Sequence, residues 1–131
     1  MESLTYLNQP DCLRLANKTV EAVVTTAIGP RILRYGFLRG ENILAELPDA
    51  VVKTDFGDWK PWGGHRLWTA PEQMPRSYEP DNEPIGAEKL GARAVRLVQG
   101  VEPATGVRKY MTVGLDATGT RLVVHHKIVN R

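Results

Sequence analysis

Apolar and polar residues alternate in short runs over most of the chain, with the period of two that half-buried strands show. Several runs are rich in β-branched residues, which suit a pleated surface. Turn signals such as Gly29-Pro30 and Pro103–Gly106 separate the runs about every 10 residues, as is typical of an all-β sandwich or barrel. The pattern predicts these strands: Cys12–Ala16, Val20–Ile28, Arg31–Leu38, Asn42–Leu47, Ala94–Glu102, Val107–Leu115 and Arg121–Val129.

We expect these strands to form one antiparallel β-sandwich, with residues 1–131 as a single domain. The connections are too short for the crossovers that parallel pairing requires. No segment sustains a helical period, and Glu88 to Arg96 has room for one helical turn at most. The last strand is apolar and lies at an edge, so we expect a second copy or a second half of the fold to pair with it.

A long irregular segment over residues 58–86 interrupts the succession of strands. Its first part, Trp59–Glu72, contains all three tryptophans, the pair Gly63-Gly64 and two prolines. Prolines stop a helix from running through, and paired glycines allow another backbone to approach closely. A long loop with this many aromatic residues is expected to be structured and functional.

Composition excludes several classes of protein. The 17 Lys and Arg residues nearly balance the 15 Asp and Glu residues, so the chain has no basic footprint for nucleic acid or a membrane surface. Cys12 is the single cysteine, which predicts a free thiol in a reducing compartment. The N-terminus lacks a signal-peptide pattern, and no apolar run approaches the ~20 residues of a membrane span. We expect a cytoplasmic protein without a cofactor.

His65 and Arg66 follow the paired glycines and are the first candidates for chemistry. An imidazole exchanges protons near neutral pH, and a guanidinium offers five hydrogen-bond donors. Each tryptophan either fills the core beneath the loop or stacks on a ligand. We assign Trp68 and Tyr78 to the binding site, because a flat aromatic face matches the apolar face of a pyranose.

Several acidic and amide residues follow the tryptophans in the sequence. Glu72 is the candidate general base, and Asp81 and Asn82, which stand between two prolines, are candidates for fixed polar contacts. Carboxylates of this kind serve as acid and base in glycoside cleavage, bind hard cations, or remain solvated on turns. Their spacing matches no metal-binding motif, so no metal site is expected.

Two further positions extend the candidate site. Arg31 begins a strand after Gly29-Pro30, and it either points into the same pocket or is exposed. His125 and His126 are adjacent in a strand, so their side chains point to opposite faces and cannot chelate one metal together. We assign His126 to the inner face. A three-histidine metal site that includes His65 stays an alternative.

Five segments together resemble the N-terminal half of the galactose mutarotase-like (aldose 1-epimerase-like) proteins, and in particular an uncharacterised bacterial group. These segments are Ala27–Leu33, Asn42–Leu44, Gly63–Glu72, Tyr78–Asn82 and His126–Asn130. The resemblance implies half of a mutarotase-like supersandwich that binds sugars in an open cleft. In role, Arg66 would match a family arginine that holds sugar hydroxyls.

The same resemblance limits what activity is expected. Members of the wider family interconvert sugar anomers with a histidine acid and a glutamate base. The family's catalytic histidine follows the strand that here runs to Asn130, and its glutamate lies much later. The resemblance therefore does not carry the catalytic pair onto this chain.

Three hypotheses of function follow from these observations. The first is a carbohydrate-binding protein, related to aldose epimerases, that lacks the complete mutarotase machinery. Its ligand-binding residues are Arg31, Arg66, Trp68, Tyr78, Asp81, Asn82 and His126. The second is a sugar mutarotase or epimerase, active as a homodimer, with His65 as general acid and Glu72 or Glu79 as base. The third is a non-catalytic protein that binds a partner through its exposed last strand.

Overall fold

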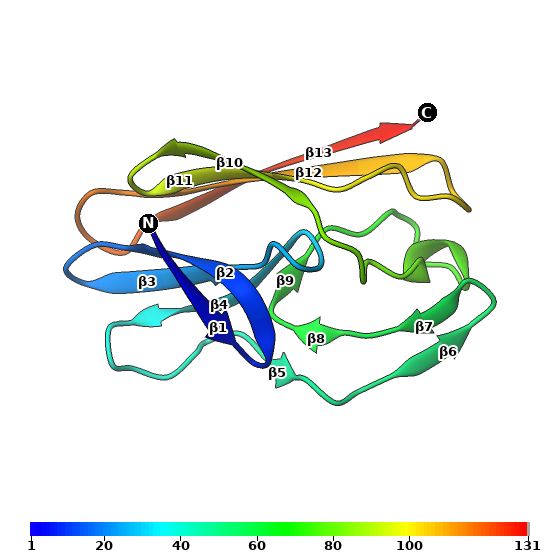
Figure 1. Ribbon diagram of the computed structural model, residues 1–131, viewed down its shortest axis with the longest axis horizontal. Coiled ribbons are helices and arrows are strands. Elements are labelled where there is room, and N and C mark those ends of the chain that lie inside the picture. Colours follow the sequence, from blue (N-terminus) through cyan, green and yellow to red (C-terminus); the bar gives the residue numbers. More distant parts are fainter. Residues whose placement is uncertain (131) are drawn as a thin grey trace.

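Two antiparallel β-sheets face each other in the computed structural model, which describes residues 1–130 (Figure 1). The first sheet has the strand order β1-β2-β3-β4-β9, with bounds Glu2–Tyr6, Gln9–Ala16, Val20–Val24, Arg31–Phe37 and His65–Arg66. The second has the order β10-β11-β12-β13, with bounds Gly86–Gly91, Ala94–Val98, Val107–Leu115 and Leu122–Asn130. The predicted all-β sandwich is confirmed.

Short elements make up much of the chain between β4 and β10. They are the pair β5 (Glu46–Leu47) with β8 (Trp62–Gly63), the pair β6 (Val52–Thr54) with β7 (Gly57–Trp59), and the 3-10 helix η1 (Arg76–Tyr78). The segment over residues 58–86, which was expected to be irregular, therefore contains the short strands β7, β8 and β9 and the helix η1. No helix within residues 1–130 is long and apolar enough to cross a membrane.

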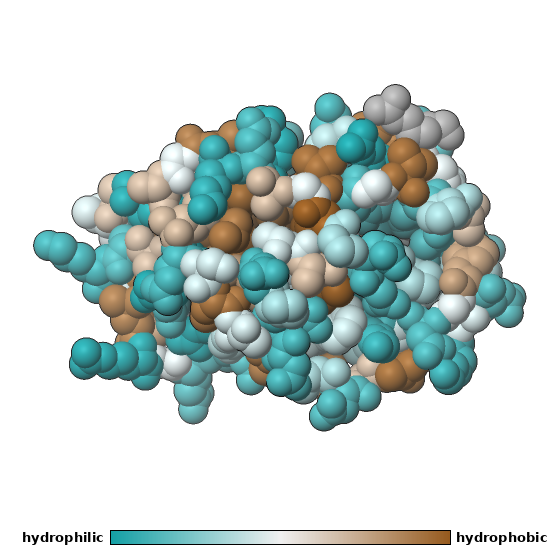
Figure 2. All heavy atoms as spheres, viewed as in Figure 1, coloured by the Kyte–Doolittle hydropathy of each residue, from teal (hydrophilic) through white to brown (hydrophobic). Residues whose placement is uncertain are grey.

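The core lies between the two sheets, and both contribute to it. Its buried members are Leu13, Leu15, Val20, Val24 and Ile32 from the first sheet and Val95, Leu97, Met111, Val113 and Leu115 from the second. Burying these side chains supplies the main favourable term in folding. Figure 2 shows that this face of the molecule is mainly hydrophilic, with hydrophobic residues visible in the seam between the layers.

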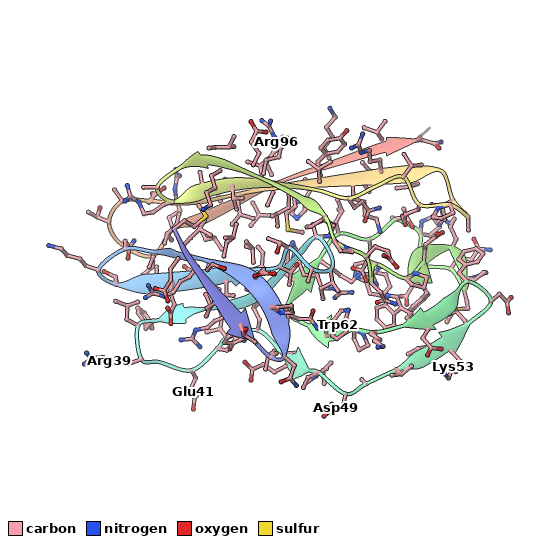
Figure 3. The ribbon with its side chains drawn as sticks, in the orientation of Figure 1. Arg39, Glu41, Asp49, Lys53, Trp62 and Arg96 are labelled. Carbon is pink, nitrogen blue, oxygen red and sulfur yellow. The ribbon has the colours of Figure 1, made fainter. Side chains whose placement is uncertain are left out.

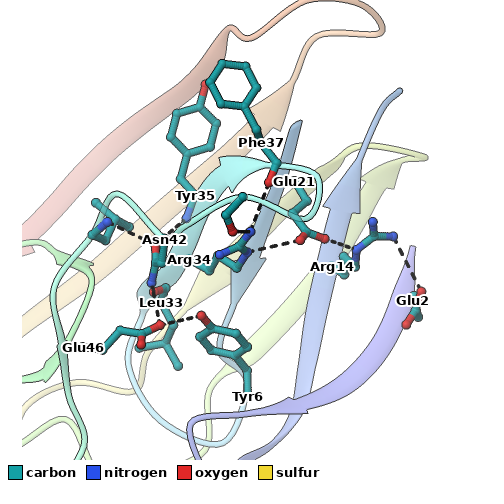
Figure 4. A network of polar contacts seen from close by, with 12 residues as sticks. Glu2, Tyr6, Arg14, Glu21, Leu33, Arg34, Tyr35, Phe37, Asn42 and Glu46 are labelled. Carbon is teal, nitrogen blue, oxygen red and sulfur yellow. Dashed lines mark hydrogen bonds and ion pairs between the residues drawn. The ribbon is translucent and has the colours of Figure 1, made fainter. Parts of the chain in front are cut away.

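Charged side chains cover the outside of the sandwich. The labelled charged residues of Figure 3, such as Lys53 and Arg96, project away from the two layers. On the outer face of the first sheet, the Glu21 carboxylate accepts hydrogen bonds from Arg14 and Arg34 (Figure 4). Burial alone raises the pKa of Glu21, but the bonds and charges of the two guanidinium groups hold that pKa below its ordinary value. This network joins β2, β3 and β4.

One expectation about local structure was wrong. The strand expected over Asn42–Leu47 is reduced to β5, because the Asn42 side chain takes the place of a strand partner. Its Oδ1 accepts from the backbone N–H of Tyr35 at 3.1 Å, and its Nδ2 donates to the carbonyl of Leu33 at 2.8 Å. Residues 88–96, where the sequence left room for one helical turn at most, form the hairpin of β10 and β11.

The second sheet ends on β13, whose outer side has no strand partner among residues 1–130. The expected position of the last strand at a sheet edge is therefore confirmed. Along β13, even-numbered residues face the first sheet and odd-numbered residues face outward. Val124 accordingly packs against the core, whereas Val123 is 48% exposed.

Gly64→Ala is expected to destabilise the protein by about 2 kcal/mol or more. Gly64 has φ +71°, and a Cβ there would lie 2.0 Å from the carbonyl oxygen of Ile32. The substitution would push β9 away from β4. Urea denaturation measures the loss. As a matched control, Gly114→Ala places its Cβ in open space and should change stability by less than about 1 kcal/mol. Equal effects of the two substitutions would contradict the close approach.

Candidate functional site

The aromatic residues of the tryptophan-rich loop pack mainly on one another. The ring of Trp59, which is 7% exposed, lies 5.8 Å from that of Trp68 and 5.0 Å from that of Tyr78, with edge-to-face geometry in both pairs. Trp68 and Tyr78 are also edge to face, at 5.2 Å. Such pairs stabilise a structure beyond the area that they bury. The three rings form one unit, which we call the aromatic cluster.

Arg66 is built into the aromatic cluster. Its guanidinium carbon lies 4.0 Å from the ring centre of Trp68 and 4.9 Å from that of Trp59, as in a cation–π contact. One Nη donates to the carbonyl of Ser77 at 3.0 Å. Burial lowers the pKa of Arg66 to about 10, so the side chain is still charged at neutral pH. The loop therefore closes around a cation.

Arg31 and Asp81 form an ion pair inside the molecule. The Arg31 side chain is 1% exposed, and its Nε and Nη2 donate to the two carboxylate oxygens of Asp81, each at 3.1 Å. The same guanidinium donates to the carbonyls of Lys60 and Pro61. Four donor contacts from the first residue of β4 thus tie the loop to the first sheet.

A second buried pair lies beneath the loop. The ammonium of Lys109, on the inner face of β12, is 3.4 Å from the Glu102 carboxylate. Burial raises the pKa of Glu102 and lowers that of Lys109. A carboxylate oxygen of Glu79 accepts from the backbone N–H of Ala104 at 3.2 Å. This end of the sandwich is polar inside, in contrast to the apolar core at the other end.

His65 and His126 meet across the two sheets. Their Nε2 atoms are 2.8 Å apart, and the ring centres are separated by 5.0 Å. His65 is on β9, opposite Ile32 of β4, and His126 is on β13, opposite Met111 of β12. Burial, with a smaller contribution from His126, lowers the pKa of His65. One ring donates and the other accepts, so this contact closes the seam between the layers.

Two separate cavities border the inner face of β13, and the histidine contact lines the smaller of them. The first has about 180 Å³ and is lined by Ile32, Tyr35, Leu44, His65, Leu122, Val124 and His126. The second has about 610 Å³ and is lined by Phe56, Thr69, Ala70, Arg76, Ala104, Thr105, Val107, Ile128 and Asn130. We call these two cavities together the β13 groove. One is mainly apolar, and the other mixes apolar with hydrogen-bonding side chains.

The structure distributes the predicted site residues over three places. His65 and His126 lie at the β13 groove, and Arg66, Trp68 and Tyr78 lie together in the aromatic cluster. Arg31 and Asp81 contact each other in the interior.

The remaining predicted residues have local partners. Asn82 donates to the backbone carbonyl of Asp58 at 3.1 Å. Glu72 is exposed and accepts a hydrogen bond from the hydroxyl of Tyr78, which raises the pKa of that phenol. Glu72 has no hydrogen bond with His65 in the described part of the chain. The roles assigned to all these residues stay predictions.

Sequence reasoning did not identify the residues of the larger cavity. Thr69 and Arg76 come from the loop, whereas Ile128 and Asn130 come from β13. The alternation of β13 places Ile128 and Asn130 on the same face as His126, and that pattern was the one available signal. No group of three or more His, Cys, Asp and Glu side chains able to hold a metal occurs within residues 1–130.

Comparison of the chain with protein-family models, with curated proteins and with solved structures found no match. The support for the candidate site is therefore its geometry.

Asp81→Ala is expected to lower the unfolding free energy by about 3–5 kcal/mol, because it leaves the buried Arg31 charge without its partner. Chemical denaturation provides the measurement. The control is Glu88→Ala, which removes a pair with Arg96 on the surface and should cost less than about 1 kcal/mol. A loss for Asp81→Ala no larger than that of the control would show that the buried pair does not hold the loop.

The lowered pKa of His65 predicts a pH dependence of stability. As the pH falls below about 6.5, the unfolded chain binds a proton that folded His65 resists, so the unfolding free energy decreases. His65→Gln should flatten this dependence between pH 6.5 and the folded pKa. Urea denaturation over a pH series, in buffer with a chelator, tests it. His125→Gln, one position from His126 on the outer face, should leave the slope at its wild-type value. A full slope in His65→Gln would exclude this group as the cause.

Proposed function

We propose that the protein binds carbohydrate in the β13 groove and is related to the aldose epimerases. The observation that carries the proposal is the His65–His126 contact in the wall of the smaller cavity, because it places two proton-exchanging groups beside an open space on the inner face of β13. The sequence resemblance to the N-terminal half of the mutarotase-like proteins supports the same class of ligand.

The lining of the groove suits the mixed surface of a sugar. A pyranose has hydroxyls that need donors and acceptors, and an apolar face that packs on a ring. Arg76, Thr105 and Asn130 supply polar groups in the larger cavity, and Phe56, which is 36% exposed, supplies an aromatic surface. The Trp68 ring lines neither cavity, and one of its faces is already in contact with Arg66.

The histidine contact also favours a second function, catalysis of anomer exchange. Opening of a sugar ring requires a base that takes the proton of the anomeric hydroxyl and an acid that protonates the ring oxygen. Two imidazoles that share a proton provide one donor and one acceptor. In this alternative His126 takes the role first assigned to Glu72, whose carboxylate contacts Tyr78.

The free outer side of β13 favours the expected homodimer. A second β13 would extend the sheet by antiparallel pairing and would form a two-fold symmetric interface. Light scattering at micromolar concentration distinguishes a monomer of 14.6 kDa from a dimer of twice that mass. The monomer mass would contradict the pairing.

Binding is tested by NMR titration of the labelled protein with a panel of monosaccharides and their acidic derivatives. At least one sugar should shift the resonances of β13, and His126→Ala should weaken that binding about tenfold or more, since a lost polar contact in a binding site typically costs 1–3 kcal/mol. His125→Ala is the matched control, because it removes a neighbouring imidazole from the outer face of the same strand.

The outcomes separate the alternatives. Shifts that persist in His126→Ala, or the absence of any shift across the panel, would exclude the β13 groove as a sugar site. Polarimetry of freshly dissolved α-glucose and α-galactose reports catalysis. Accelerated anomer exchange that is lost in both His65→Ala and His126→Ala would support the enzyme, and an unchanged rate at high protein concentration would exclude it.

A further inference from the structure

The larger cavity of the β13 groove has an unbalanced charge. Among the described residues that line it, Arg76 is the one with a charged side chain, and there is no Asp or Glu. Thr69, Thr105 and Asn130 add side chains that can donate hydrogen bonds. A guanidinium remains protonated at every pH at which proteins are folded. The electrostatic potential in this space of about 610 Å³ is therefore set by a permanent cation.

Arg76 has no carboxylate partner within residues 1–130. One Nη of its partly buried guanidinium donates to the backbone carbonyl of Pro71, which is a neutral acceptor. Other arginines of the chain form ion pairs with Asp or Glu, namely Arg14, Arg31, Arg34, Arg96 and Arg121. The charge of Arg76 is thus not neutralised by the described part of the chain, although the side chain lies in the wall of a cavity.

Two polar groups in the same wall also lack hydrogen-bond partners. The Nε of Arg76 and the hydroxyl of Thr69 are shielded from solvent, and neither has a partner among the described residues. Shielded polar groups in folded proteins are normally paired. This wall therefore has an excess of donors, which an occupant rich in acceptor oxygens would complement.

An anionic group on the ligand matches this wall better than a neutral one. A hydrogen bond between a guanidinium and an anionic oxygen is stronger than one between neutral groups. The attraction also increases where the charge is partly removed from water, because the effective dielectric constant is lower there. The hydroxyls of a sugar would meet Thr105 and Asn130, and its apolar face would meet Phe56.

We propose that Arg76 makes the larger cavity an anion site and thereby selects acidic sugars over neutral ones. The anion site rests on the lining of the cavity alone, whereas the choice of a sugar as its ligand rests on the proposed function. A sugar carboxylate and a sugar phosphate offer Arg76 the same chemistry, and separate titrations distinguish them.

The test is an NMR titration of the labelled full chain with glucuronate, glucose 6-phosphate and glucose. At least one acidic sugar should bind about tenfold or more tightly than glucose and should shift the amide resonances of Thr69 and Thr105. Added salt should weaken the binding of the acidic sugar and reduce its advantage over glucose, a readout that requires no variant.

Variants of Arg76 assign the preference to one side chain. In Arg76→Gln the affinity ratio of acidic sugar to glucose should fall to about one, whereas Arg76→Lys, which keeps the charge, should retain part of the preference. The matched control is Arg96→Gln, which removes an exposed arginine that pairs with Glu88 and should leave the ratio at its wild-type value.

The outcomes separate this proposal from the proposed function. Equal affinities for acidic and neutral sugars in the wild type, or a preference that survives in Arg76→Gln, would overturn the selection by Arg76 and leave sugar binding standing. If no sugar binds, titrations with acetate and with inorganic phosphate decide. Shifts at Thr69 and Thr105 that vanish in Arg76→Gln would support the anion site and contradict the proposed function alone, and the absence of such shifts would overturn both.

Discussion

The guanidinium of Arg31 is buried, so protein groups have to accept its hydrogen bonds. The position of the loop depends on those hydrogen bonds. Arg31 is the first residue of β4, and its side chain donates hydrogen bonds to Asp81 and to the carbonyls of Lys60 and Pro61. A buried charge is tolerated only when it is paired and hydrogen-bonded. The loop is therefore held against the sheet, and the backbone beside Arg31 pairs with His65 and Arg66.

The interior of the sandwich has two halves with different physical character. One half is an aliphatic core that both sheets share, and its cohesion comes from removing apolar surface from water. The other half holds Lys109 with Glu102 and the aromatic cluster around Arg66. Burial of polar groups adds little net stability, but it requires a specific arrangement of donors and acceptors. The smaller cavity of the β13 groove is lined by Ile32 and Val124 of the aliphatic half, whereas the larger cavity is lined by polar side chains such as Arg76 and Asn130.

The strands could be predicted from the sequence because their alternation is a local signal. The same alternation placed His125 and His126 on opposite faces, but it did not decide which of them faces inward. Contacts between distant residues carry no such signal: Arg31 meets Asp81 across 50 positions, and His65 meets His126 across 61. The strand β10 was missed because all of its residues are exposed, so no buried face imposed a period of two. The side chain of Asn42 replaced a strand that propensity favoured.

The two edge strands of the four-stranded sheet, β10 and β13, differ in exposure and in charge. On β10 every residue is exposed, and Glu88 and Lys89 place charges of both signs along the rim, which discourages another strand from pairing there. On β13 the rim is long, regular and partly apolar. A strand from another molecule is therefore expected to pair with this sheet at β13 and not at β10. In two molecules joined through β13, the joined sheet would end on β10 at both sides, so pairing through this sheet would stop at two molecules.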